Sequence, residues 1–272
     1  MIDHAYAHAG KEVDGMVRGL YTAYTGMVNE QKRLDIIANN LANSATVGYK
    51  EENVTNQSFD EMLTIKTKDA SEAYNDRPIG NMSLGVKLGE VYTNYGQGSL
   101  RQTSSTYNMA LEGNGFFTLG VTDKAGNAST QYTRNGNFTM TKDGHIVDAD
   151  GNHLMGEGGD ITIPTDAGDV IIDTDGAIYA DGAYIDTLQV TDFENYDYLI
   201  KSGGTMYQAL DGAVETPASA MVKQGFTEQS NVNVVSEMVE MITVTRAYEA
   251  NQKVIQSIDK TLDLAVNSVG RI

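Results

Sequence analysis

Cysteine is absent from this 272-residue chain, which excludes disulfide bonds, thiolate metal sites and cysteine nucleophiles. Long apolar runs are also missing, and the mean hydropathy of -0.33 agrees with the absence of a transmembrane helix. Proline occurs only 3 times and glycine 28 times. This balance is typical of long unbroken helices combined with many tight turns.

Basic residues are scarce, because 19 Lys and Arg stand against 37 Asp and Glu and give a formal net charge of -18. Such a surface repels a phosphate backbone, so we expect no nucleic-acid partner. An acidic surface by itself indicates solubility and no particular ligand.

Candidate metal and catalytic motifs all lack an essential part. Asp148–Asn152 begins like a calcium loop, but position 159, where the bidentate Glu belongs, is a glycine, which favours a plain hairpin turn. His4 and His8 have helical spacing but no third ligand nearby. No carboxylate pair stands in an apolar setting that would separate two pKa values. We therefore expect no enzyme activity, no cofactor and no metal.

The last helix is the strongest pattern in the sequence and is expected over about residues 230–269. Residues at alternating gaps of three and four are apolar, aromatic or small, with Asn251 as the exception. A helix of that length runs about 55 Å at about 1.5 Å per residue, so its apolar seam needs a partner. The expected seam residues here are Met241, Val244, Tyr248, Ile255, Ile258 and Leu262.

A second heptad pattern begins at Val17, near the other end of the chain. It predicts a helix over residues 16–50, with a polar Gln31 within the seam. The expected seam residues are Leu20, Tyr24, Met27, Leu34 and Leu41. Two terminal helices of this kind predict a coiled-coil stem, with the middle of the chain as an outgrowth.

The middle of the chain has the character of an antiparallel β domain. Asp-Gly and Asn-Gly dipeptides recur between short alternating runs such as 116–119 and 177–179, which predicts hairpins. The fold class is therefore α+β, with long terminal helices and a central irregular antiparallel β domain. The expected parts are residues 16–50, a connector with extended segments over 51–102, the β domain over 103–207, and a return segment with the last helix over 208–272.

Residues 1–15 differ in character from the rest of the chain and contain no secretory signal. The codons that can encode Lys11-Glu12-Val13 include a bacterial ribosome-binding sequence a short distance before Met16. We therefore expect translation to begin at Met16, with residues 1–15 as an untranslated or disordered leader.

The segment that ends the first helix is rich in asparagine, a poor helix former. Asn39 and Asn43 share one helix face, where they are placed to hydrogen-bond across an interface and fix its register. The alternative is an ordinary helix C-terminus at which Gly48 turns the chain. Both interpretations are compatible.

Segments at both ends and in the middle resemble one known family. Ala38–Asn43 with Thr46–Lys50 resembles the amino-terminal signature of the bacterial flagellar rod and hook axial proteins, and Ser230–Ile242 with Arg246–Glu249 resembles the carboxy-terminal one. The middle is similar to the central β segment of rod members at Ala110–Phe117. The motif residues are Asn39, Asn40, Asn43, Gly48, Asn231, Asn233, Arg246 and Glu249.

The resemblance implies a structural subunit without catalysis, which polymerises helically into a drive shaft from motor to hook. It implies an inner tube of terminal helices and an outer β layer. The implied partners are further copies of the chain, other rod and hook proteins, ring proteins and the flagellar export apparatus, without membrane insertion. The implied location is the basal body, after export into the cell wall or periplasm. Length and the form of residues 246–249 favour a distal rod member, then a proximal one, then a hook protein.

Two other classes of function remain as alternatives. A wall-active enzyme or peptidoglycan-binding module would release or retain cell-wall material, although the missing acid/base pair weighs against the enzyme. A soluble coiled-coil adaptor would form a small fixed oligomer instead of an open-ended filament.

Overall fold

A computed structural model of the chain describes residues 2–66, 77–122, 128–264 and 266–267. The chain divides into two compact units. The helical unit comprises Met1–Leu41, Glu52–Thr93 and Val234–Ile272, and the β unit comprises Ala42–Glu51 and Asn94–Asn233. No helix among the described residues is long and apolar enough to cross a membrane.

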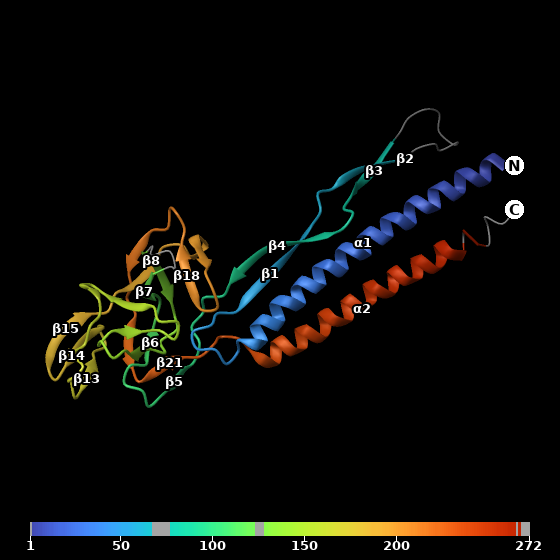
Figure 1. Ribbon diagram of the computed structural model, residues 1–272. Helices are drawn as coiled ribbons and strands as arrows, with labels where there is room; N and C mark the ends of the chain where they lie inside the picture. The colour runs from blue at the N-terminus through green and yellow to red at the C-terminus, as the bar shows by residue number, and fades with distance from the viewer. Residues whose placement is uncertain (1, 67–76, 123–127, 265, 268–272) are drawn as a thin grey trace. The chain divides into compact units, whose positions relative to one another are not determined.

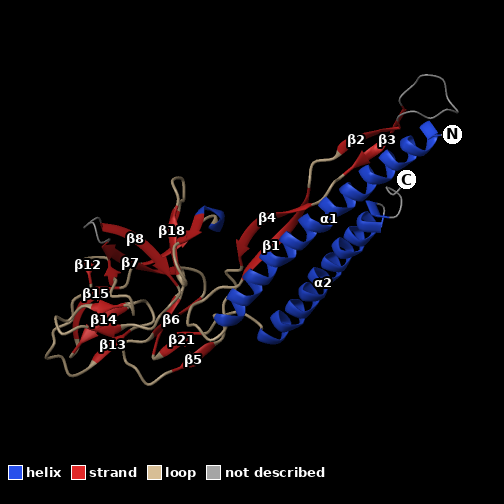
Figure 2. Cartoon of the chain, turned by 45° about the vertical axis from the view of Figure 1, so that its right-hand side comes forward, coloured by secondary structure: helices blue, strands red, loops and turns tan. Residues whose placement is uncertain are grey.

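The helical unit contains α1 (Ile2–Ala42) and α2 (Val234–Leu264), which run antiparallel and side by side (Figures 1 and 2). Their closest approach coincides with two glycines in the interior of α1. A Cβ placed on Gly26 would lie 2.9 Å from Nδ2 of Asn251, and one on Gly19 would lie 3.5 Å from Cδ1 of Ile258. Glycine inside a helix lowers stability by about 0.5–1 kcal/mol relative to alanine. At these two positions the close packing of the two helices offsets that loss.

A two-stranded ribbon of β1 (Glu52–Ser58) and β4 (Val86–Thr93) continues into β2 (Met62–Lys66) and β3 (Arg77–Met82) and follows α1 in both views (Figures 1 and 2). Polar side chains of α1 hold it. Thr22 donates a hydrogen bond to the carbonyl of Leu84 (3.1 Å), and the Asn29 amide donates to Oδ1 of Asn56 (3.1 Å).

The ribbon lies within the expected connector with extended segments over 51–102, and it begins in residues 51–80. Their described parts, 51–66 and 77–80, are largely strand, whereas 67–76 lie outside the described residues. The sequence hid β1 because both of its faces are polar apart from Val54. Neither face therefore gives the alternation by which strands are recognised.

The β unit consists of antiparallel strands. Its largest sheet has ten strands, seven of them in the order β17-β18-β8-β7-β11-β10-β9, with β12 on β11 and with β16 joining β19 to β7. A three-stranded sheet β13-β14-β15 and the pairs β20-β6 and β21-β5 complete the unit. The strands are β5 (Leu100–Gln102), β6 (Met109–Glu112), β7 (Phe116–Thr122), β8 (Ala128–Thr133), β9 (Thr139–Met140), β10 (Ile146–Val147), β11 (His153–Gly156), β12 (Gly159–Asp160), β13 (Val170–Ile172), β14 (Ala177–Ala180), β15 (Ala183–Thr187), β16 (Val190–Phe193), β17 (Leu199–Lys201), β18 (Met206–Ala209), β19 (Glu215–Pro217), β20 (Met221–Gln224) and β21 (Phe226–Glu228), with the 3-10 turn η1 (Tyr196–Tyr198) before β17.

Two hydrophobic clusters form the core of the β unit. The larger is aliphatic with two phenylalanines, and Phe117 and Phe138 meet edge to face at 5.4 Å. The smaller is aromatic and contains Phe116, Tyr132 and Tyr207. The Asp-Gly turns behave as predicted, and Gly176 adopts a φ of 85° between β13 and β14, a conformation that L side chains rarely adopt.

The structure confirms an α+β fold with one helix at each end and antiparallel β structure between them. Some boundaries differ from the prediction. α1 ends at Ala42 instead of residue 50, because the chain turns at 43–48 and Gly48 has a φ of 70°. The run at 161–163 forms only an isolated bridge at Thr162. Residues 2–15 have helical backbone, and the translation start at Met16 stays a prediction, as do the expected domain boundaries.

Candidate functional site

The inner face of α2 is the face on which the sequence places a seam. Val244 is 1% exposed, and the other predicted seam residues of α2 are half-buried, whereas the positions between them are mostly exposed. The half-buried ones are Met241, Tyr248, Ile255, Ile258 and Leu262. Their part in assembly stays a prediction, since their burial occurs within one chain.

The buried face of α1 is displaced from the seam that the sequence places there. Ala23 and Ile37 are buried, whereas the predicted seam residue Tyr24 is 54% exposed, so Tyr24 does not pack into the helix pair of one chain. Gly19 and Gly26 allow α2 to approach α1 closely on their side. The other predicted seam residues lie half-buried at the margin: Leu20, Met27, Leu34 and Leu41.

Asn40, one of the motif residues, joins three parts of the helical unit. It is 1% exposed, its Nδ2 donates to the carbonyl of Glu52 (2.8 Å), and its Oδ1 accepts from the amide of Glu52 (3.0 Å). Nδ2 also lies 3.4 Å from Oε2 of the buried Glu237 at the start of α2. By bonding both the N–H and the C=O of Glu52, the Asn40 side chain takes the place of a neighbouring strand. It thereby fixes the position at which β1 begins beside α1.

Ion pairs add to the same face of α1. Arg33 contacts Glu30 at 3.1 Å on its own helix and Glu240 of α2 at 2.9 Å. All three groups retain partial solvent access, so these pairs contribute to alignment more than to stability. Together with Asn40 they align α1 with the first turns of α2.

Asn231, from the carboxy-terminal motif, makes the equivalent connection in the β unit. Its Oδ1 accepts from the amide of Glu51 (2.8 Å), and its Nδ2 donates to the carbonyls of Asn94 (2.7 Å) and Gly96 (3.1 Å). Asn40 and Asn231 therefore bind the backbone of consecutive residues, Glu52 and Glu51. The two terminal motifs thus act on one point of the chain, where the ribbon begins.

A buried charge cluster, formed by Lys50, Arg134 and Glu228, lies in the β unit. Glu228 is fully buried and accepts from Nζ of Lys50 (2.5 Å), from Arg134 (3.3 Å) and from the amide of Gly98 (2.8 Å). Arg134 also lies over the ring of Phe116, 5.4 Å from its centroid. Burial lowers the pKa of Lys50, and the Glu228 carboxylate opposes that shift. The cluster connects four segments that are distant in the sequence, and its hydrogen bonds form only when all four are in place.

The remaining motif residues either shape the turn after α1 or have exposed side chains. Asn43 accepts a hydrogen bond from Thr46 (3.2 Å) in the turn after α1, and a Cβ on Gly48 would collide with the backbone of Asn135. The expectation of an ordinary helix C-terminus with a glycine turn therefore holds for this segment. The side chains of four motif residues are exposed: Asn39, Asn233, Arg246 and Glu249.

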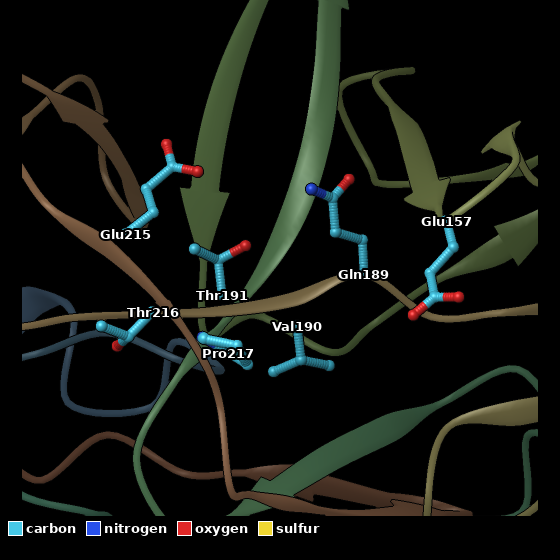
Figure 3. A pocket seen from close by; sticks show the side chains of 7 residues that line it. All are labelled: Glu157, Gln189, Val190, Thr191, Glu215, Thr216 and Pro217. Carbon is cyan, nitrogen blue, oxygen red and sulfur yellow. The ribbon is translucent and has the colours of Figure 1, made fainter.

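The hollow in Figure 3 has a volume of about 380 Å³. Glu157 and Glu215 lie at its two ends, and the residues between them come mostly from β16 and β19. The Tyr132 hydroxyl donates to Glu215 (2.5 Å), and burial together with this bond raises the pKa of Tyr132. The lining contains no His, Lys or Arg.

Polar clusters elsewhere also lack the donor set of a metal site. His145 and His153 stack with their centroids 4.9 Å apart, and His153 contacts Asp160 at 3.1 Å. Across the described ranges, no group of three His, Cys, Asp or Glu side chains is placed to hold an ion. The amide of Gly151 donates to the carbonyl of Asp148 (3.0 Å), which confirms a hairpin turn at this position.

The sequence did not point to Glu228, Lys50 and Arg134, or to Glu237. Lys50 ends a recognised motif and Glu228 stands two residues before Ser230, so position alone offered a weak signal. Their pairing follows from strand contacts between residues more than 80 positions apart, as the hydrogen bonds of Glu228 show. Such contacts leave no periodicity in a single sequence.

Three segments match described protein families. Residues 20–50 match "Flagella basal body rod protein", residues 110–180 match "Flagellar hook protein FlgE/F/G D1 domain", and residues 223–268 match "Flagellar basal body rod FlgEFG protein C-terminal". The matched segments contain Asn40, Arg134, Glu228 and Asn231, four of the residues that join distant parts of the chain.

Whole-chain relatives agree with these segments. The chain is 35% identical to the flagellar basal-body rod protein FlgG of Bacillus subtilis, over 93% of this chain and 99% of the relative. It is 34% identical to FlgG of Caulobacter vibrioides, over 90% and 97%. It is 31% identical to the flagellar basal-body rod protein FlgF of Rhizobium meliloti, over 94% and 99%.

Proposed function

Because the chain belongs to the flagellar basal-body rod family, we propose that it is a structural subunit of the bacterial flagellar rod, and specifically of its distal part. Its full-length similarity to FlgG proteins carries this proposal. The family is structural and not catalytic.

The distal assignment is finer than the family and depends on a small difference. Identity to FlgG proteins runs from 30% to 35%, and identity to two FlgF proteins is 31% and 29%. The form of Arg246–Glu249 supports the same choice. The proximal rod or the hook is the second assignment within the family.

In the proposed polymer, α1 and α2 form a coiled-coil stem, and the stems pack helically into a shaft that transmits torque from motor to hook. The exposed Tyr24 of the predicted α1 seam supports this arrangement, because a large apolar side chain left open in one chain is available to another. The β units form the outer layer of the shaft.

The proposed location is the flagellar basal body, reached by export across the cytoplasmic membrane through the flagellar export apparatus. The proposed partners are further copies of the chain, other rod and hook proteins, and the rings that surround the rod. Family membership supports the rod and hook partners directly, and the rings and the export apparatus follow from the proposed location.

Deletion of the gene tests the function. Basal bodies isolated from the deletion strain are expected to lack the distal rod in electron micrographs, and the gene supplied from a plasmid is expected to restore it. Loss of only the proximal rod would favour the proximal assignment, and loss of the hook alone would favour the hook. Intact basal bodies with normal motility would contradict a rod function.

A second test addresses the polymer itself. Purified chains are expected to form filaments at high concentration, seen by electron microscopy and light scattering, with an accompanying increase in helical circular dichroism. A chain that remains a small fixed oligomer at every concentration would contradict the proposal and favour an adaptor.

A further inference from the structure

The hollow shown in Figure 3 has a carboxylate at each end. Glu157 lies at one end and Glu215 at the other, with Val190 and Thr191 between them. Its volume of about 380 Å³ falls within the range of about 300–1,000 Å³ that pockets for small organic ligands occupy. All of the lining residues belong to the β unit, so the hollow is formed within one folded unit.

The surroundings of the hollow are strongly negative. Residues 143–200, which supply most of the lining, contain 14 Asp and Glu and neither Lys nor Arg. Lys201, the next basic residue along the chain, lies over the ring of Tyr49. Lys223 pairs with Glu112 at 2.6 Å. Because none of the described residues that line the hollow is basic, it attracts cations and repels anions.

The polar side chains of the lining are partly oriented and partly free. Oε1 of Glu215 accepts a hydrogen bond from the buried Tyr132 hydroxyl (2.5 Å), which fixes this carboxylate and leaves its Oε2 available to a ligand. Across the described ranges, the side chains of Glu157 and Gln189 make no hydrogen bond or ion pair. The hollow therefore offers one oriented carboxylate, one unpaired carboxylate and one unpaired amide.

The placement of the two carboxylates fits a ligand with two cationic ends. They lie at opposite ends of the hollow and do not converge on a single ion. In the described part of the chain, no group of three His, Cys, Asp or Glu side chains is placed to hold a metal. Between the carboxylates, the side chains of Val190 and Pro217 present carbon atoms (Figure 3). A methylene chain with a cationic group at each end matches this order, because methylene groups lie along apolar surface while the charge stays in water.

We propose that the hollow binds a linear alkyl diammonium ligand, with one ammonium group on Glu157, the other on Glu215 and the methylene chain along Val190. An ammonium group has three N–H donors, and its hydrogen bonds to a carboxylate are about twice as strong as those between neutral groups. In a triamine, the side-chain carbonyl of Gln189 accepts from the internal amine. This binding activity is additional to the proposed rod function and does not depend on it.

Isothermal titration calorimetry of the full-length chain at low ionic strength tests the proposal with putrescine, cadaverine and spermidine. We expect one saturable site, with the tightest binding for the ligand whose length matches the separation of the two glutamates. Each diamine is compared with the alkylamine of equal chain length, which is butylamine for putrescine and pentylamine for cadaverine. The alkylamine lacks one charge-assisted hydrogen bond and should bind at least about tenfold more weakly.

Three substitutions that each remove one negative charge separate the hollow from the acidic surface as a whole. Glu157→Gln and Glu215→Gln should each weaken the binding of the tightest diamine at least about tenfold. Asp143→Asn, at an exposed turn position outside the lining, should change it by less than about twofold, because a distant exposed charge is screened. Near-ultraviolet circular dichroism should match the wild type in all three variants, since each replaced side chain is exposed.

Two results would overturn the proposal by showing general attraction to an acidic surface. One is equal binding of a diamine and its matched alkylamine, and the other is equal weakening by Asp143→Asn and Glu157→Gln. Binding of a neutral chitin trisaccharide without binding of any diamine would overturn it in favour of a saccharide site. None of these results bears on the rod function, which the deletion strain tests.

The same ligand chemistry occurs in a free polyamine and in two neighbouring lysine side chains of a peptide. A blocked Lys-Lys dipeptide titrated beside spermidine distinguishes these two sources. Tighter binding of spermidine supports the proposal and assigns the hollow to free polyamines. Tighter binding of the dipeptide supports it equally and assigns the hollow to lysine side chains of a partner protein.

Discussion

The helical unit and the β unit use apolar residues in opposite ways. Among the described residues of the helical unit, the buried apolar side chains are Ala23, Ile37 and Val244, whereas the β unit has two clusters of buried apolar residues. Large apolar side chains of α1 and α2 remain exposed instead, as Tyr21 and Val235 do. The β unit is built to be stable within one chain, and the helical unit is built to be completed by others.

The helical unit and the β unit also differ in the polar contacts that align their segments. The helical unit is aligned by single polar side chains such as those of Asn29, which binds the Asn56 side chain, and Asn40, which binds the backbone of Glu52. The β unit has a fully buried ionic cluster around Glu228 within a packed core. Substitutions are therefore expected to act on different properties: folding of the chain in the β unit, and assembly in the helical unit.

The largest effect on folding is expected at Glu228. Glu228→Gln leaves Lys50 and Arg134 buried without a full counter-charge, which should lower the free energy of unfolding of the β unit by about 3–5 kcal/mol. Urea unfolding followed by near-ultraviolet circular dichroism of the tyrosines measures it. Glu157→Gln, at an exposed carboxylate, is the matched control. A loss no larger than the control's would mean that the cluster does not stabilise the unit.

Assembly should fail, with little change in folding, when the inner face of α2 receives a charge. Ile258→Asp places a carboxyl group on the half-buried seam. A neutral polar group buried without a hydrogen bond costs about 2–7 kcal/mol, and an ionised carboxylate costs more. We expect no filaments by electron microscopy and an unchanged unfolding curve for the β unit. Ser257→Asp, at the neighbouring exposed position, should still polymerise. Normal filaments from Ile258→Asp would refute the seam.

A smaller effect is expected at Asn40, the residue that positions the ribbon on α1. Asn40→Ala leaves the buried backbone groups of Glu52 without their partner, a cost of about 1–3 kcal/mol. Faster hydrogen exchange in β1 and β4, with unchanged exchange in the β unit, is the expected result. Asn39→Ala, on the exposed side of the same turn, is expected to alter exchange little. Equal exchange in the two variants would show that the asparagine does not hold the ribbon.

The contrast between the two units also explains which structural features could be predicted from the sequence. The predicted seam positions of α2 lie on its less exposed side within one chain, because one periodic pattern meets one partner side, and their part in assembly stays a prediction. On α1 the predicted seam residue Tyr24 is exposed within one chain, where α2 and the ribbon both pack against this helix. The small residues Gly19, Ala23 and Gly26, which set the contact with α2, carry no apolar signal.

In the β unit, turns and strands were predictable and the ionic cluster was not. Asp-Gly dipeptides such as 175–176 specify a local conformation, so they can be recognised from two residues. The pairing of Lys50 with Glu228 joins residues 178 positions apart and depends on the completed strand order. The sequence therefore predicts local structure in this unit, and the contacts that hold it together require the fold.

The smallest predicted effect concerns Asp148, a buried carboxyl in a hairpin of the β unit. Burial raises its pKa above 3.8, opposed by a hydrogen bond from the amide of Ala149. The folded state therefore binds the proton more tightly than the unfolded state, and stability falls as pH rises from below 3.8 through the raised pKa. Asp148→Asn keeps an acceptor for the Ala149 amide and removes this loss.

At neutral pH we expect Asp148→Asn to be more stable than the wild type by roughly 0.5–1 kcal/mol, the size of an ordinary single substitution. Thermal unfolding measured from pH 7 downward should show the two curves converging as the wild-type carboxyl becomes protonated. Asp143→Asn, at an exposed turn position, should lack this convergence. A constant difference between Asp148→Asn and the wild type at all pH values would show that the desolvated charge is not its cause. Because the hairpin belongs to the β unit, filament formation should be unaffected at neutral pH, which separates folding from assembly once more.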